Sequence, residues 1–127
     1  MKAREHNEQT ALFHWCAVNR KKYPELDLLF AIPNGGHRDI RTASRLKAEG
    51  VKAGVPDLFL PVEKLIQATG PVTVRFNGLF IEMKVKPNKP TPAQQEWIER
   101  LRKKSYCVAV CYSWLEAVEV IRTYLGK

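Results

Sequence analysis

Two apolar stretches in the middle of the chain carry charged residues where a buried strand would not tolerate them alone. The first stretch is GVPDLFL, residues 54–60, and the second is LFIEMKV, residues 79–85. Asp57 opens the apolar run of the first, and Glu82 and Lys84 lie inside the second. Burying such groups is unfavourable unless they are paired or bind a metal ion. These two stretches therefore constrain both the fold and the chemistry of the chain.

Strand geometry predicts how these charges are arranged. Alternate residues of a strand point to opposite faces, so Phe80, Glu82 and Lys84 share one face and the apolar residues between them face the other way. If the two stretches pair as strands, Asp57 can lie beside Glu82. Adjacent carboxylates repel each other unless a cation lies between them. A hard divalent cation, which prefers oxygen ligands, is the natural occupant of such a site.

The overall charge points to a polyanionic partner. The 127 residues are predicted to form a single domain, residues 1–127, with 45% hydrophobic residues and a formal net charge of +8. Nucleic acid is the first candidate for the partner of so basic a chain. A basic protein without such a partner is the alternative, and charge alone does not separate the two.

Compartment and redox state are also predicted. No apolar run approaches the ~20 residues needed to span a bilayer. The N-terminal sequence MKAREHNEQT lacks the apolar centre of a signal peptide. The expectation is a cytoplasmic protein without a membrane partner. The three cysteines form no CxxC pair, so we expect reduced thiols and no zinc site.

Apolar periodicity predicts helices and strands in alternation, which implies a mixed sheet covered by helices. Helices are expected at residues 4–22 and 39–49, from the Thr91 cap onward and from residue 114 onward. Strands are expected at residues 26–32, 57–62, 72–76, 79–85 and 106–112. Asn77-Gly78 between two apolar runs is typical of a β-hairpin turn. Residues 63–70 fit either a short helical turn or an insertion.

Two polar residues lie on predicted inner faces of helices. Glu8 is four residues before Leu12 and continues the apolar stripe of the first helix. The alternative is an ordinary glutamate, because the helix dipole favours a carboxylate in the first turns. Gln94 shares the inner face of the third helix with Trp97. Thr91 and Gln94 also fit a capping box, in which the amide bonds back to the cap residue. A cap of this kind does not exclude a functional role.

Basic residues around a glycine-rich turn and a proline-rich loop are candidates for contacts with a phosphate backbone. The turn PNGGHR, residues 33–38, contains residues that tolerate positive φ, and a plain connector is the alternative reading. The helix after it carries arginines at spacings of three and four, for which a solvated face is the alternative. The predicted DNA-binding residues are Asn34, Gly35, Arg38, Arg41, Arg45, Lys52, Lys86 and Lys89.

The pattern P-D, a gap, then E-x-K resembles the PD-(D/E)xK nuclease superfamily. The order of motifs is similar to that of a minimal, stand-alone VRR-NUC domain, the virus-type replication and repair nuclease family. The motifs are Glu8 in the first helix, Pro56-Asp57, Glu82-Met83-Lys84, and Gln94 after the helix start Thr91-Pro92. The resemblance covers nearly the whole chain, and only residues 63–74 do not align clearly.

The resemblance implies an α/β fold with a restriction-endonuclease-like core, a mixed central sheet flanked by helices. It also implies hydrolysis of DNA phosphodiester bonds with Mg²⁺ or Mn²⁺. The implied metal ligands are Asp57, Glu82, the backbone carbonyl of Met83, and Glu8. Lys84 would steady the attacking hydroxide and the developing charge, and Gln94 would orient Lys84 or the scissile phosphate.

The resemblance further implies a structure-specific endonuclease that resolves four-way (Holliday) DNA junctions as a homodimer. Two alternatives remain open at this point. One is a monomeric nuclease for flaps or single strands, and the other is a basic DNA-binding module without catalysis. The second alternative would explain the +8 charge but not the carboxylates inside apolar strands. An HNH-type nuclease is disfavoured because the three histidines lack metal-finger spacing.

Overall fold

The computed structural model describes residues 2–33, 40–67, 70–71 and 73–127. Its centre is a four-stranded mixed sheet in the order β1-β2-β5-β6. The strands are β1 (Phe30–Ala31), β2 (Leu58–Leu60), β5 (Leu79–Met83) and β6 (Cys107–Cys111). β5 pairs antiparallel with β2 and parallel with β6. This is the mixed α/β arrangement expected from the sequence.

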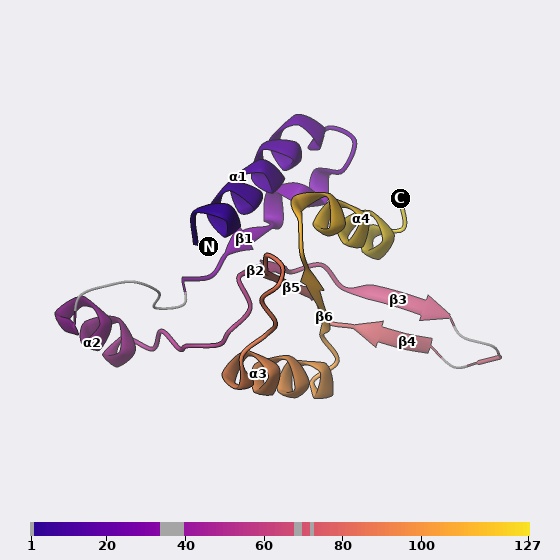
Figure 1. Ribbon diagram of the computed structural model, residues 1–127. Coiled ribbons are helices and arrows are strands. Elements are labelled where there is room, and N and C mark those ends of the chain that lie inside the picture. The colour runs from indigo at the N-terminus through magenta and orange to yellow at the C-terminus, as the bar shows by residue number, and fades with distance from the viewer. Residues whose placement is uncertain (1, 34–39, 68–69, 72) are drawn as a thin grey trace.

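Helices cover both faces of this sheet. α1 (Lys2–Asn19) and α4 (Trp114–Leu125) contact each other and lie on one side, and α3 (Pro92–Lys103) lies on the other (Figure 1). The main core lies under α1 and α4. It contains fully buried Leu12, Leu58, Ile81 and Ile121. No helix in the described part of the chain is long and apolar enough to cross a membrane.

α2 (Ile40–Ala48) stands away from the sheet, and none of its residues is buried (Figure 1). It confirms the predicted second helix, and Gly50 after it has the positive φ of 98° that a glycine C-cap adopts. The start of α3 is also as predicted, because Thr91 forms a complete capping box with Gln94.

The strand predicted at residues 26–32 is wrong over most of its length. A 3-10 helix, η1 (Pro24–Leu28), occupies its first half, and only β1 is extended. Pro24 begins η1, where its missing N–H costs nothing. Leu26 and Leu29 are buried whereas Leu28 and Phe30 are exposed, so only part of the apolar run faces the core, as a turn followed by a short edge strand.

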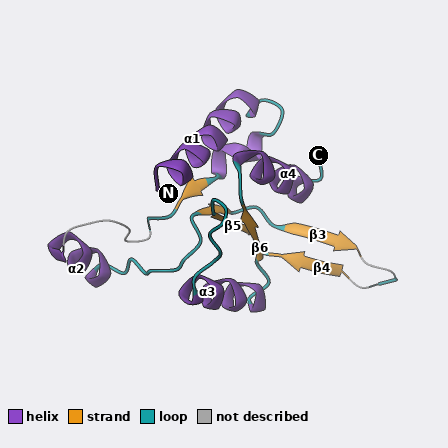
Figure 2. Ribbon diagram, in the orientation of Figure 1, coloured by secondary structure: helices purple, strands orange, loops and turns teal. Residues whose placement is uncertain are grey.

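The predicted hairpin around Asn77-Gly78 is also wrong. β4 (Thr73–Phe76) pairs with β3 (Lys64–Gln67) instead, so residues 64–67 of the segment expected to be a helical turn or an insertion form a strand. β5 cannot pair with β4 because β2 and β6 occupy both of its edges. Gly78 serves close packing, since a Cβ there would lie 2.7 Å from the Phe59 ring. Figure 2 shows the β3–β4 hairpin as a pair of arrows extending away from the main sheet.

Candidate active site

The structure brings Asp57 and Glu82 together across two neighbouring strands. Leu58 pairs with Ile81, so the residue before β2 is opposite Glu82 on β5. The Asp57 carboxylate is held in place because its Oδ2 accepts a hydrogen bond from the Met83 N–H at 2.8 Å. The antiparallel register thus produces the pair of carboxylates that the sequence predicts.

Glu82 is the most constrained charged residue of the site. Its side chain is 1% exposed, and its Oε1 is the buried side-chain oxygen that accepts no hydrogen bond from the residues described. Burial, together with the charge and hydrogen bond of the Asp57 carboxyl, raises the pKa of Glu82 from 4.5 to about 9. The charge of Glu5 also raises this pKa, and that of Lys84 lowers it. The protein alone therefore holds Glu82 in its neutral form near pH 7.

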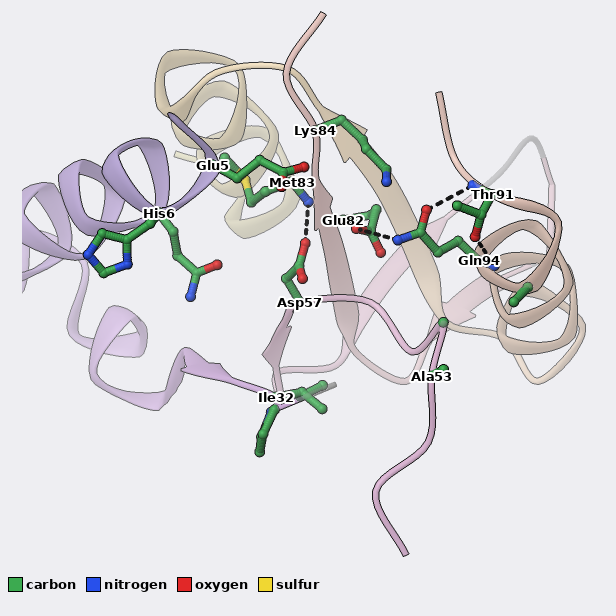
Figure 3. Close-up of a pocket in the computed structure, with 14 residues that line it drawn as sticks. Glu5, His6, Ile32, Ala53, Asp57, Glu82, Met83, Lys84, Thr91 and Gln94 are labelled. Carbon is green, nitrogen blue, oxygen red and sulfur yellow. Dashed lines mark hydrogen bonds between the residues drawn. The ribbon is translucent and has the colours of Figure 1, made fainter. Parts of the chain in front are cut away.

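Lys84 follows the end of β5 and is also buried, with 8% of its surface exposed. Its N–H donates to the Cys111 carbonyl at 2.9 Å, which extends the β5–β6 ladder to this residue. Figure 3 shows its ammonium group pointing toward Glu82 and Gln94. An ammonium group buried beside two carboxylates compensates part of their charge.

Gln94 combines the two roles considered for it. Its Oε1 accepts from the Thr91 N–H at 2.9 Å, which completes the capping box. Its Nε2 donates to Glu82 Oε2 at 3.4 Å (Figure 3). The capping box fixes the side chain so that its amide faces the carboxylate.

These groups line a cavity of about 740 Å³ that also includes residues from α1 and the loop before β2. The additional lining residues are Glu5, His6, Gln9, Ile32, Pro33, Ala53, Gly54, Met83, Thr91 and Ala93. Gly54 has a φ of 92°, and a Cβ there would lie 2.9 Å from the Ala93 carbonyl oxygen. Glycine therefore lets the loop pass directly over the start of α3.

Glu8, the predicted carboxylate of the first helix, does not line this cavity. Its Oε2 accepts from the backbone N–H of Trp114 at 3.5 Å, at the first residue of α4. Glu5, one turn earlier, lines the cavity in its place and extends from α1 toward Met83 and Asp57 (Figure 3). Helical spacing allows Glu5 as well as Glu8 on the inner side of α1, because Glu5 lies seven residues before the buried Leu12.

The predicted DNA-binding residues lie outside the cavity. Arg41 and Arg45 are exposed on α2, and Lys52 is exposed on the loop that follows it. Lys86 and Lys89 are exposed on the loop after the E-x-K strand, and the Lys86 ammonium lies 5.9 Å from the centre of the Tyr112 ring. Asn34, Gly35 and Arg38 lie outside the described residues. The contacts of these residues with DNA stay predictions.

The pair of carboxylates in this cavity offers donor atoms that fit a divalent cation. Among the residues described, no three His, Cys, Asp or Glu side chains converge on one point. Mg²⁺ does not require such a group, because it is bound through one or two carboxylates and retains water or substrate phosphate as its other ligands. The Asp57–Glu82 pair, with the unsatisfied Oε1 of Glu82, matches this preference.

A carboxylate just before β2, a second on β5 and a buried lysine two residues further on match the PD-(D/E)xK pattern recognised in the sequence. The model of one such family, the VRR-NUC domain, matches residues 3–114. A solved structure described as a VRR_NUC domain protein is 32% identical, with a TM-score of 0.73, and the match covers 97% of this chain and 88% of the other. The chain belongs to the VRR-NUC nuclease family. No protein of curated function matches it.

Proposed function

We propose that the protein is a DNA endonuclease that requires Mg²⁺ or Mn²⁺ and uses Asp57, Glu82 and Lys84 as its catalytic residues. The main support is the buried Glu82, whose carboxyl lies against Asp57 with one oxygen unsatisfied. When both groups are ionised, two carboxylates in this arrangement carry a free-energy cost that a cation between them removes. The family supports the same chemistry, since its members are nucleases.

Each residue has a distinct role in this proposal. Asp57 and Glu82, with the backbone carbonyl of Met83, hold the cation, which when bound polarises the phosphoryl oxygen and acidifies water. The Met83 N–H orients Asp57, and the Gln94 amide orients Glu82. The Lys84 ammonium, a compact point charge, stabilises the attacking oxygen and the negative charge that develops on the phosphate.

We further propose that the substrate is a branched DNA, above all a four-way junction, and that a homodimer cuts it. Each chain carries one set of catalytic residues, whereas resolving a junction requires two cuts. A two-fold dimer places its two sites symmetrically. The predicted DNA contacts are exposed lysines and arginines on α2 and the two loops, which suit recognition of phosphate and shape rather than of bases.

Cleavage assays on matched DNA substrates test this function. Mg²⁺ or Mn²⁺ should support paired, opposed cuts in an immobile four-way junction in preference to the linear duplex of the same sequence. Ca²⁺ should support binding with little turnover, because its longer and looser coordination positions water poorly. Full activity in EDTA would exclude the metal mechanism. Preferred cleavage of flaps or single strands by a monomer would exclude junction resolution and leave the nuclease assignment intact.

Glu5 and Glu8 should respond differently to substitution by glutamine. Glu5 lines the cavity and acts electrostatically on Glu82, so Glu5→Gln should slow cleavage by roughly tenfold or more, as loss of a charge near a metal centre does. Glu8→Gln keeps the contact with the Trp114 N–H through its amide oxygen and should change the rate little. Single-turnover rates at saturating Mg²⁺ measure both. The reverse order of effects would restore Glu8 as the catalytic carboxylate.

Metal binding is expected to release a proton from Glu82. Its pKa of about 9 in the metal-free protein means that Mg²⁺ competes with a bound proton below that pH. The affinity for Mg²⁺ should therefore rise with pH up to about 9, by roughly tenfold per pH unit if one proton is released. Calorimetric titration in buffers of different ionisation enthalpy counts the protons. Affinity that is constant across the neutral range would contradict this linkage.

A further inference from the structure

The β3–β4 hairpin forms a two-stranded sheet of its own and projects from the body of the protein (Figure 1). Three of its apolar side chains are exposed: Leu65 by 55%, Ile66 by 41% and Val74 by 42%. An isolated two-stranded hairpin is marginally stable in water and usually packs against another element. Its free edges and exposed apolar residues are features of a strand pair that meets a partner.

The two faces of this hairpin differ. Ile66 pairs with Val74 and Lys64 with Phe76, so these four residues share one face by strand alternation. Leu65 pairs with Arg75 on the opposite face, where Arg75 also forms an exposed ion pair with Glu63 at 3.4 Å. One face is therefore largely apolar, and the other is largely polar with a single leucine.

The apolar face of the hairpin continues into a groove of about 460 Å³ on the side of the sheet that α4 covers. The groove is lined by Lys64, Ile66, Phe76, Cys107, Ala109, Glu119, Val120, Thr123 and Tyr124. None of these residues lines the cavity that contains Asp57 and Glu82. We call the groove together with Val74 the hairpin face. A partner on this face would leave the catalytic cavity open to DNA.

Charge on the hairpin face is balanced, unlike charge on the whole chain. Its two charged side chains, Lys64 and Glu119, have opposite signs. The Lys64 ammonium already donates to the carbonyls of Thr123 and Tyr124 at 3.0 and 2.7 Å, and Glu119 pairs with Arg122 at 3.3 Å. Two copies of a chain with a net charge of +8 repel each other least where the surfaces that meet are neutral. The hairpin face is such a surface and is unsuited to binding a polyanion.

We propose that the hairpin face is the homodimer interface, with the apolar face of each hairpin docked in the groove of a second copy of the chain. The inference rests on the dimer of the proposed function and names its contact surface. A two-fold axis makes this contact self-complementary, because each copy contributes both a projecting hairpin and a groove. The hairpin of each copy is then covered by its partner, and the two catalytic cavities stay accessible.

Sedimentation equilibrium of the full chain and three matched variants tests the interface. Wild-type protein should be a dimer of twice 14.6 kDa. Ile66→Glu and Val74→Glu each place a charge in the apolar contact and should weaken the dimer by roughly 100-fold, as loss of a central contact does. Leu65→Glu introduces the same charge on the opposite, more exposed face and should stay dimeric. Circular dichroism establishes that each variant is folded.

The groove also contains a native reporter of its occupancy. Cys107 lines it and is partly exposed, whereas Cys16 and Cys111 are buried. N-ethylmaleimide should label Cys107 in dilute protein and more slowly at concentrations that favour the dimer. In Ile66→Glu, labelling should be independent of concentration. This measurement needs no DNA and no metal.

The outcomes separate the interface from the enzymatic function. A monomeric wild-type protein, or a dimer that Ile66→Glu and Val74→Glu leave intact, would overturn the interface, whatever the nuclease activity. A dimer that depends on these residues but cuts no DNA would confirm the interface and overturn the proposed function. If the interface and the proposed function are both correct, Val74→Glu should still nick DNA with Mg²⁺ but lose paired cleavage of four-way junctions.

Discussion

Replacing Asp57 by asparagine, or Glu82 by glutamine, is expected to reduce Mg²⁺-dependent cleavage by roughly 100-fold or more, the usual loss when a major electrostatic group is removed from an active site. The two changes nearly preserve shape, so neither leaves a void. They remove the charges that balance the cation. Asp57→Asn also weakens the hydrogen bond that its Oδ2 accepts from the Met83 N–H.

Thermal unfolding distinguishes loss of the metal site from loss of the fold. Glu82 is neutral in the metal-free protein near pH 7, because its pKa is about 9. Glu82→Gln resembles that neutral form and should keep the melting temperature of the wild-type protein in EDTA. The variant should lose the stabilisation that Mg²⁺ gives the wild-type protein. Wild-type cleavage rates for Asp57→Asn in Mg²⁺ would refute the assignment of the site.

The pair of carboxylates was predictable because strand alternation and apolar burial leave little freedom. Leu58 and Ile81 must both face the core, and the register that pairs them puts Asp57 opposite Glu82. A slip of one residue would turn the fully buried Leu58 and Leu60 away from the core. The Gln94 capping box was predictable for a similar reason, since its pattern is local and follows Pro92 at the helix start.

The partners of β4 were not predictable from local sequence. Asn77-Gly78 has strong turn chemistry, but the β5 edges are taken by β2 and β6, which come from distant parts of the chain. The Asn77 N–H donates instead to the Ser105 carbonyl at 2.8 Å. Lys64–Gln67 was not recognised as a strand because three of its four residues are exposed, which leaves no buried face for a pattern to indicate.

The position of Glu8 shows that the apolar stripe of a helix does not by itself predict which glutamate reaches the cavity. Glu5 and Glu8 lie three residues apart, so both fall near the apolar side of α1, and Leu12 is spaced suitably for either. Glu5 and Glu8 differ in the part of the protein that each side chain contacts. Glu8 reaches the backbone of Trp114 at the start of α4, and Glu5 reaches the cavity. Those neighbours are set by the packing of α1 on the sheet and on α4, which the helix sequence alone does not contain.

Replacing Lys84 by methionine should also slow cleavage by roughly 100-fold or more. The physical reason differs from that for the two carboxylates. Methionine fills similar space in a site where the lysine is 8% exposed, so packing should survive. The ammonium that stabilises the developing charge on the phosphate is lost. The two carboxylates remain, so Mg²⁺ should still bind. Because the charge of Lys84 lowers the pKa of Glu82, binding of Mg²⁺ should shift toward higher pH in this variant.

Lys86→Met is the matched control, because it removes the same charge two residues further along the chain. Lys86 is exposed and lies outside the catalytic cavity, so its loss should weaken DNA binding and the salt dependence of binding while leaving the single-turnover rate at saturation nearly unchanged. Calorimetry with Mg²⁺ and single-turnover cleavage, measured on both variants, separate metal binding, DNA binding and catalysis. If Lys84→Met cut DNA as fast as Lys86→Met, the buried lysine would be a structural counter-charge to Asp57 and Glu82 rather than a catalytic residue.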